Sequence, residues 1–459
     1  MNSFLVLSTT LALLPAQPIP AGATVHLIVQ PMAAPKPALR YQLLPQVSEL
    51  SPGNPYQGYI KCFMEQRNFY FSKAGVALRT EILSLPLVEL PKKHAVYLGN
   101  LRYADWAARL DTLDWQLTER IHKEGLDFQA GELPALRALA SALQARLRTL
   151  VAYKKFPEAI DGAKTMFKLA RDLGEYPAPE ANLFGISIVH LALDTFEEML
   201  QQTGCPNLYW ALTDLPSPLV ELRKGLQGHA TLVANEFKPL RSDVVMTDAE
   251  LENIVSRMSG INGLAREQAG LPPKNWRAGL EARLKDKERV REAHIHFLDD
   301  RGDRDLYQVV ILNAKIPALQ IILLDEKRCY NAQLGERMKL VSLALWQSDA
   351  CSAPKAQDDG LFADLLPNVL ALRRAQARLE QRLALLRSIE ALRLSAADHA
   401  GKLPEELAAL PVPLPNDPIT GKPFVYELKD SVAHLRGSPP RGEEKNPEFN
   451  LRYEVTIKK

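Results

Sequence analysis

Three polar side chains in the middle of the chain, His190, Asp194 and Glu197, have the spacing of one helix face. They are four and three residues apart, so in a helix they would project from the same side. An imidazole and two carboxylates in that arrangement could hold a divalent ion or relay a proton. The alternative is a solvated or partly buried polar patch. A third ligand from another helix would distinguish the two.

A second candidate set, Asn207, Tyr209, Trp210 and Asp214, lies within residues 204–216. Its functional interpretation is a polar and aromatic wall of a binding cleft. Its structural interpretation, which we favour, is a rigid turn. Trp210 would then be an anchor, and Asn207 would bond nearby backbone amides.

His294 and His296 are followed by a run of acidic residues, which suggests a metal site. The context is helical, however, and residues two apart on a helix point to nearly opposite sides. The acidic run also lacks the pattern of a calcium loop. The chain contains no G-x-S-x-G, P-loop, H-E-x-x-H or dinucleotide-binding motif. We therefore assign no catalytic residue, no metal site and no cofactor.

The elements that would position the first two sets are amphipathic helices over residues 136–151, 158–173 and 181–201. In each, apolar residues recur every three or four positions, which predicts one buried face. The short connections between them predict antiparallel neighbours. Further elements are expected as strands over 24–29 and 39–44, helices over 274–298 and 316–346, a long helix over 368–399, and strands over 424–428, 432–436 and 451–457.

These elements predict a mainly α protein, with a TPR-like antiparallel helical bundle and a small C-terminal antiparallel β module packed on the long helix. The first strands of the chain are an alternative edge for that sheet. The TPR-like feature is the turn Phe156-x-x-Ala159-Ile160, which resembles the start of the second helix of a tetratricopeptide repeat. The expected divisions are a signal peptide over 1–23, strands and short helices over 24–130, a helical body over 131–350, and the long helix with the sheet over 351–459.

Composition and charge exclude some function classes. The 459 residues are 46% hydrophobic and 24% charged, as in an ordinary globular protein, and the net charge is +2. Such a charge gives no general electrostatic reason to expect a nucleic-acid partner. No stretch approaches the roughly 20 apolar residues of a membrane span, so we expect no transmembrane segment in the mature chain.

The N-terminus has the features of an export signal. Residues 4–14 form a short apolar run, and Ala21-Gly22-Ala23 provides a small-x-small cleavage site. We therefore expect an exported protein, periplasmic or extracellular. Cys62, Cys205, Cys329 and Cys351 are far apart, which does not match a zinc site. Disulfides and buried free thiols both remain possible interpretations.

Two resemblances concern larger parts of the chain. The tail residues Leu403-Pro404, Asp417-Pro418, Gly421 and Pro423-Phe424-x-Tyr426 resemble the globular part of type II secretion pseudopilins, which implies a local shape and not filament assembly. Residues 31–41, 206–212 and 452–457 resemble a bacterial, planctomycete-type exported family of unknown function. That resemblance implies export and architecture.

Two functions are consistent with this sequence. The first is an exported helical scaffold or interaction protein that binds another protein or a cell-envelope component. The alternative is a hydrolase of unrecognised type, whose site would be the helix face with His190, Asp194 and Glu197. The lack of a catalytic motif favours the scaffold.

Overall fold

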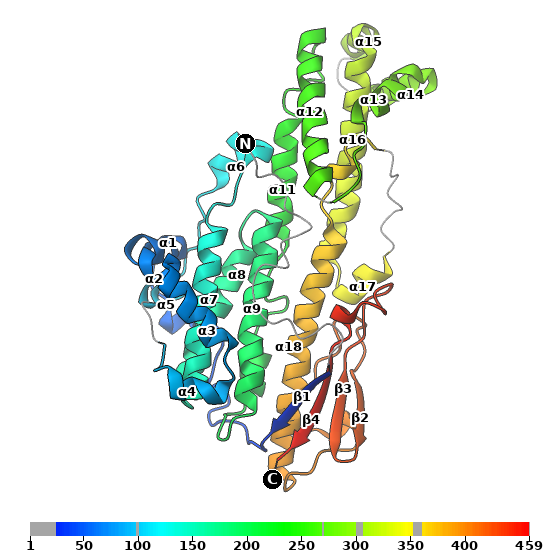
Figure 1. Ribbon diagram of the computed structural model, residues 1–459. Helices are drawn as coiled ribbons and strands as arrows, with labels where there is room; N and C mark the ends of the chain where they lie inside the picture. Colours follow the sequence, from blue (N-terminus) through cyan, green and yellow to red (C-terminus); the bar gives the residue numbers. More distant parts are fainter. Residues whose placement is uncertain (1–23, 98–100, 269, 300–305, 352–359, 459) are drawn as a thin grey trace.

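The computed structural model describes residues 24–97, 101–268, 270–299, 306–351 and 360–458, so the expected signal peptide lies outside the described residues. The chain is mainly helical, with one four-stranded sheet (Figure 1). The helices are α1 (Pro55–Glu65), α2 (Arg67–Phe71), α3 (Lys73–Ser84), α4 (Leu90–Lys93), α5 (Arg102–Ala107), α6 (Thr118–Glu124), α7 (Leu133–Ala152), α8 (Phe156–Gly174), α9 (Pro179–Leu200), α10 (Tyr209–Thr213), α11 (Arg223–Glu236), α12 (Asp248–Gln268), α13 (Trp276–Lys285), α14 (Lys287–Asp299), α15 (Leu306–Lys315), α16 (Ala318–Met338), α17 (Leu345–Ala350) and α18 (Val369–Asp398). The strands are β1 (Thr24–Val29), β2 (Val425–Lys429), β3 (Val432–Arg436) and β4 (Arg452–Ile457).

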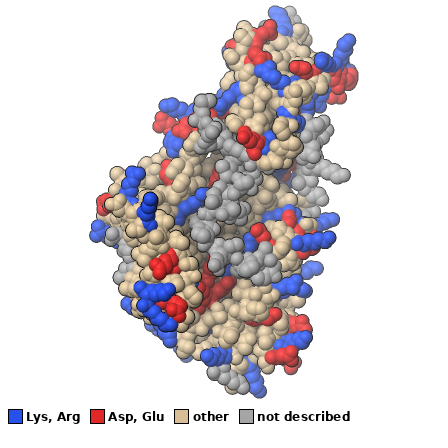
Figure 2. Space-filling view, in the orientation of Figure 1, with Lys and Arg blue, Asp and Glu red and all other residues tan. Residues whose placement is uncertain are grey.

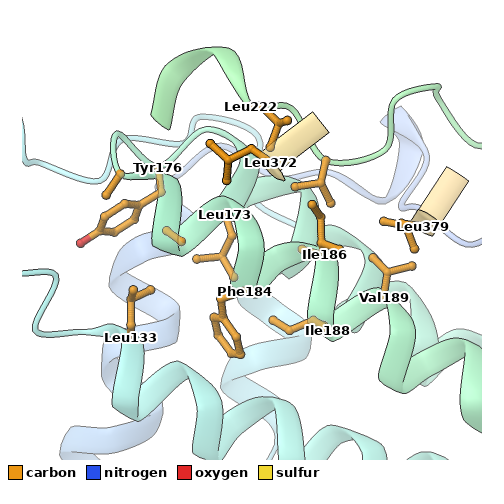
Figure 3. Close-up of a cluster of buried hydrophobic side chains, with 14 of the residues drawn as sticks. Leu133, Leu173, Tyr176, Phe184, Ile186, Ile188, Val189, Leu222, Leu372 and Leu379 are labelled. Atoms are coloured by element: carbon orange, nitrogen blue, oxygen red, sulfur yellow. The ribbon is translucent and has the colours of Figure 1, made fainter. Parts of the chain in front are cut away.

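Helices α7, α8 and α9 form the predicted bundle, and α18 packs beside α9. The first three begin with a proline in the first turn, where the missing amide donor costs nothing. Figure 3 shows the core that they share with α18, in which Ile186 and Val189 of α9 lie near Leu372 and Leu379 of α18, and Phe184 points toward α7. The predicted apolar spacing is therefore confirmed as a buried face. The TPR-like character of the packing remains a prediction.

The link between α8 and α9 is fixed by a buried amide. The Asn182 side chain donates to the carbonyl oxygens of Leu173 at 2.8 Å and Gly174 at 3.3 Å, which lie in the last turn of α8, where carbonyls lack intrahelical partners. Helix α11 crosses this link closely because Gly225 and Gly228 have no side chain. A Cβ atom on Gly228 would lie 2.0 Å from the Pro177 carbonyl oxygen.

The tail sheet has the strand order β1-β4-β3-β2. Strands β2, β3 and β4 are antiparallel, as predicted, and a two-residue turn with positive φ at Asp430 and Ser431 joins β2 to β3. The sheet is mixed and not purely antiparallel, because β1 pairs parallel to β4, from Thr24 opposite Arg452 to Val29 opposite Ile457. The first strand thus joins the sheet edge, as the alternative prediction proposed.

Three predicted elements differ in the structure. Residues 39–44 form turns and not a strand, with the Arg40 amide donating to the Pro37 carbonyl. The helix expected over 274–298 is two helices, because the Asp286 carboxylate caps a new helix through the amides of Glu288 and Arg289. The helix expected over 316–346 ends at Met338 and is followed by a 3₁₀ turn and α17.

The remaining helices flank this framework. Helices α1 to α5 lie on the outer side of α7, and α12 to α16 lie toward the end of the molecule that is opposite the sheet (Figure 1). One cluster of buried apolar side chains runs from Leu27 of β1 to Val455 of β4 and includes residues from the body and both flanks. Of the helices in the described ranges, none combines the length and apolarity needed to cross a bilayer.

Candidate functional site

The polar face of α9 meets an arginine from the long helix. The Arg382 side chain of α18 is buried, and its Nε donates to Glu197 Oε1 at 3.0 Å. Nη2 donates to Asp194 Oδ1 at 2.6 Å, and Nη1 lies 3.3 Å from His190 Nδ1. The structure therefore brings together the three residues predicted from spacing. The partner that approaches from another helix is a cation and not a further ligand.

The sheet supplies a fifth member of this cluster. Tyr453 of β4 is buried, and its hydroxyl donates to Glu197 Oε1 at 2.5 Å. Glu197 thus joins α9, α18 and the sheet through one carboxylate. We call His190, Asp194, Glu197, Arg382 and Tyr453 the Arg382 cluster.

Burial controls the protonation of the Arg382 cluster. Burial raises the pKa of the Glu197 carboxyl, and the nearby Arg382 guanidinium opposes that rise. Burial lowers the pKa of His190 well below its ordinary value, and the positive charges of Arg382 and Arg378 lower it further. The imidazole is therefore neutral at pH 7, and its Nδ1 can accept a hydrogen bond from Arg382.

This arrangement limits the chemistry of the α9 face. The guanidinium of Arg382 lies between the two carboxylates, where a divalent ion would have to bind, and it would repel that ion. Across the part of the chain that the structure describes, no group of three or more His, Cys, Asp and Glu side chains could hold a metal. The cluster acts as a buried ion-pair network that connects three elements.

A cavity of about 450 Å³ lies beside the Arg382 cluster. Asp194 and Glu197 line one side, and Val25, His26 and Leu27 of β1 line another. A larger cavity of about 670 Å³ lies where α17 and α18 meet the segment that leads into α11. Both volumes are in the range of small-molecule sites.

The second predicted set, Asn207, Tyr209, Trp210 and Asp214, includes buried side chains whose contacts hold the local fold. Asn207 is buried, accepts from the Tyr209 amide at 3.0 Å and donates to the Glu390 carbonyl at 2.9 Å. The buried Tyr209 donates its hydroxyl to the Pro413 carbonyl, and Trp210 packs edge-to-face on its ring at 5.0 Å. Asp214 is exposed at the end of α10. None of these four residues lines either cavity.

The remaining candidates are separate from one another. His294 Nδ1 lies 2.8 Å from Asn313 Oδ1, and His296 Nδ1 lies 2.9 Å from Asp325 Oδ1, so the two histidines have different partners. The four cysteines, which the sequence left open between disulfides and thiols, are free, and Cys62 and Cys205 are buried.

Sequence reasoning missed Arg382, Tyr453 and a second buried pair, Glu390 and Arg393. Arg393 is fully buried, pairs with Glu390 at 2.8 Å, and donates to the Cys205 carbonyl at 2.9 Å. The position of Arg382 within the long helix could have indicated that its side chain is buried. Arg382 follows Leu379 by three residues and precedes Leu386 by four, so it lies on the predicted apolar face.

Comparisons with known proteins identify no relative. No protein-family model matches the chain, and neither the curated proteins nor the solved structures contain a match. The family resemblances described from the sequence therefore remain predictions.

Proposed function

We propose that this chain is an exported helical scaffold that binds a cell-envelope component through its N-terminal helical layer. We define the N-terminal layer as residues 55–109, which include α1 to α5. The framework of α7, α8, α9, α18 and the sheet would hold this layer in a fixed position. The buried polar clusters would support that framework.

The observation that carries this proposal is the distribution of exposed apolar side chains. Among the described residues, 17 large apolar side chains are exposed, and six of them lie in the N-terminal layer. The layer is 55 of 459 residues, so an even distribution would place about two there. The six are Met64, Phe71, Val76, Leu78, Val88 and Trp106, which we call the apolar patch residues. This excess of exposed apolar side chains over the even distribution supports an interaction site on the layer.

The body holds the N-terminal layer firmly. Arg148 of α7 is buried and donates to the carbonyl oxygens of Ile82 and Leu83, both at 2.7 Å. It also pairs with Glu198 of α9 at 2.5 Å. One arginine therefore ties the end of α3 to two bundle helices, and the layer is presented on a rigid support.

Sedimentation with isolated bacterial cell envelopes tests this function. The full chain should co-sediment, and the triple variant Met64→Ser, Phe71→Ser, Trp106→Ser should lose at least fivefold in the bound fraction. These side chains are 79%, 46% and 48% exposed, so their replacement should leave the fold intact, which circular dichroism would check.

The matched control changes three apolar side chains that are 40%, 45% and 48% exposed on α12, α14 and α15. Leu264→Ser, Ile295→Ser, Val310→Ser should bind envelopes like the natural chain, since these residues lie on α12, α14 and α15. Equal binding by the two triple variants would overturn the proposal.

A second candidate function rests on the cavity beside the Arg382 cluster. Asp194 and Glu197 reach both this cavity and Arg382, so a substrate there could contact ionised groups. Under this hydrolase proposal, the chain should hydrolyse a member of a panel of ester, glycoside and peptide substrates. Asp194→Asn should abolish that turnover and leave envelope binding unchanged. A folded natural chain with no turnover on the panel would remove the support for a hydrolase.

A further inference from the structure

We propose that the envelope component bound by the N-terminal layer is the surface of an anionic lipid membrane. This inference rests on the proposed function and specifies its partner. It follows from the charges around the apolar patch residues, from their position on the molecule and from the reach of the neighbouring side chains.

The N-terminal layer is basic, although the whole chain is nearly neutral. Residues 55–109 contain eight Lys and Arg against four Asp and Glu, whereas the whole chain has 56 against 54. The layer thus carries a net charge of +4, and the other residues together carry −2. Figure 2 shows the flank where α1 to α5 lie as mostly tan surface with separate blue and red side chains.

Three of the four acidic groups of the layer have cationic partners. Glu65 lies 3.6 Å from Lys61 and Glu89 lies 2.8 Å from Lys92, whereas Glu81 lies 3.4 Å from the His94 imidazole, which is a cation only when it is protonated. The fourth acidic group, Asp105, pairs with Arg146 of α7 at 2.7 Å. Glu65 also attracts Arg102, and Glu89 attracts Lys93, but neither carboxylate lies within 4.0 Å of that second cation.

Four exposed cations of the layer have no such partner. Arg67, Lys73, Lys93 and Arg102 have no carboxylate within 4.0 Å among the residues that the structure places. They lie on α2, α3, α4 and α5, the elements that carry or adjoin the apolar patch residues. Unpaired cations next to exposed apolar side chains complement a surface that has anionic headgroups above an apolar interior.

Two cations and an aromatic ring lie close together between α1 and α5. Lys61 Nζ and Arg102 Cζ each lie 4.8 Å from the centre of the Tyr103 ring. Met64 is exposed on α1 and Trp106 on α5. Long basic side chains can extend toward headgroups while their aliphatic parts and neighbouring aromatic rings stay at the interface.

The position of the apolar patch residues favours a lipid surface over a protein ligand in a pocket. None of the six lines either of the two cavities. They are exposed on α1, α2, α3, α5 and the 3₁₀ turn before α4, and helices α1 to α5 lie on the outer side of α7 (Figure 1). Such separate protruding side chains can each enter the headgroup region, as on an interfacial amphipathic helix. A peptide ligand would instead need a groove or a paired strand.

Flotation with pure lipid vesicles tests this inference directly. The full chain is mixed with vesicles of phosphatidylcholine alone or with about 30 mol% phosphatidylglycerol. We expect at least tenfold more bound protein with the anionic vesicles. Raising the salt to about 0.5 M should reduce this binding, because it shortens the screening length below about 5 Å.

Two variants separate charge from apolar insertion. Arg67→Gln, Lys73→Gln, Lys93→Gln, Arg102→Gln should abolish the preference for anionic vesicles. The triple variant Met64→Ser, Phe71→Ser, Trp106→Ser should reduce binding to anionic vesicles at least fivefold. The variant with Leu264→Ser, Ile295→Ser, Val310→Ser should bind like the natural chain.

The outcomes distinguish this inference from the function on which it rests. Envelope sedimentation that depends on the apolar patch residues, combined with no binding to pure vesicles, would overturn the lipid partner and indicate an envelope protein. Equal binding to neutral and anionic vesicles would overturn the role of the cations. Loss of patch-dependent envelope binding would refute the proposed function itself.

Discussion

Individual charged residues connect the parts of this protein. Arg382 and Arg393 are buried on α18 and bond to groups from α9 and from the segment before α10. A buried ion pair is stable only while its hydrogen bonds are complete, because desolvation penalises each charge. Removal of one partner leaves the other charged and buried.

Arg382→Met should therefore lower the free energy of unfolding by about 3–5 kcal/mol. Methionine fills most of the space but leaves the buried carboxylate of Glu197 and that of Asp194 without their cation. Chemical denaturation followed by circular dichroism measures the loss.

An exposed ion pair provides the control for this substitution. Arg291 and Glu288 pair on α14 with side chains 68% and 62% exposed, so Arg291→Ala should lower the free energy of unfolding far less than Arg382→Met does. Equal losses for Arg291→Ala and Arg382→Met would show that burial of the Arg382 cluster contributes nothing.

His190 should make the stability depend on pH. An unfolded imidazole takes up a proton near pH 6.5, whereas the lowered pKa keeps His190 neutral in the folded chain. Below pH 6.5 the unfolded state therefore binds more protons, and the free energy of unfolding falls as the pH falls, by up to ~1.4 kcal/mol per pH unit.

His190→Gln should remove this contribution. Between pH 7 and pH 5 the variant should lose less stability than the natural chain, as measured by denaturation at each pH. The comparison is needed because Glu197 has a raised pKa and acts in the opposite direction, stabilising the folded chain as the pH falls. Parallel pH profiles for the two proteins would contradict the assignment.

The sequence predicted the members of the α9 face but not their role. The spacing of His190, Asp194 and Glu197 requires only a helix, which is a local property. Their partner Arg382 is 185 residues beyond Glu197, so the contact depends on how α9 and α18 pack. Arginine is also common on solvated helix faces, which concealed its burial.

At the scale of elements, close packing depends on small residues. The turn between α8 and α9 lies against α11 because Gly225 and Gly228 allow the backbones to approach. A side chain at either position would meet main-chain atoms or the buried Asn182 amide. These glycines are therefore required by packing, although helix propensity disfavours them.

Gly228→Ala should destabilise the protein by about 1–3 kcal/mol, because its Cβ would lie 2.0 Å from the Pro177 carbonyl oxygen and the main chain would have to move. Gly260→Ala is the matched control. Gly260 lies in α12 with no atom within 4 Å of its Cβ position, so alanine there should stabilise by about 0.5–1 kcal/mol. Thermal unfolding of both variants measures the two effects, and the same sign for both would refute this account.

The sequence predicted elements well where one local pattern decides them. Leucine spacing identified α18, and Asn368 caps it by accepting from the Ala371 amide at 3.1 Å. The break at Asp286 was missed because the helical pattern of apolar residues continues across it. An aspartate inside a helix and an aspartate that caps a helix differ in backbone geometry, which the sequence does not show. The strand predicted over 39–44 failed because β propensity cannot supply a neighbouring strand.

At the scale of the whole molecule, the two ends of the described chain form one sheet. Strand β1 lies along β4, and Leu27 and Val29 are buried with the tail strands in the continuous core. β1 also contacts α9. The N-terminal strand thus connects the helical body to the tail, which the sequence could suggest but not establish.

Leu27→Ala should therefore destabilise the body and the tail together, by about 2–5 kcal/mol, because it removes buried contacts where both meet. Hydrogen exchange would measure the effect in β4 and in α9 separately. Ile28→Ala, whose side chain is 55% exposed on the same strand, is the control and should change neither region by more than about 1 kcal/mol. Faster exchange in β4 with unchanged exchange in α9 would show that the sheet unfolds independently, and that β1 does not couple the two.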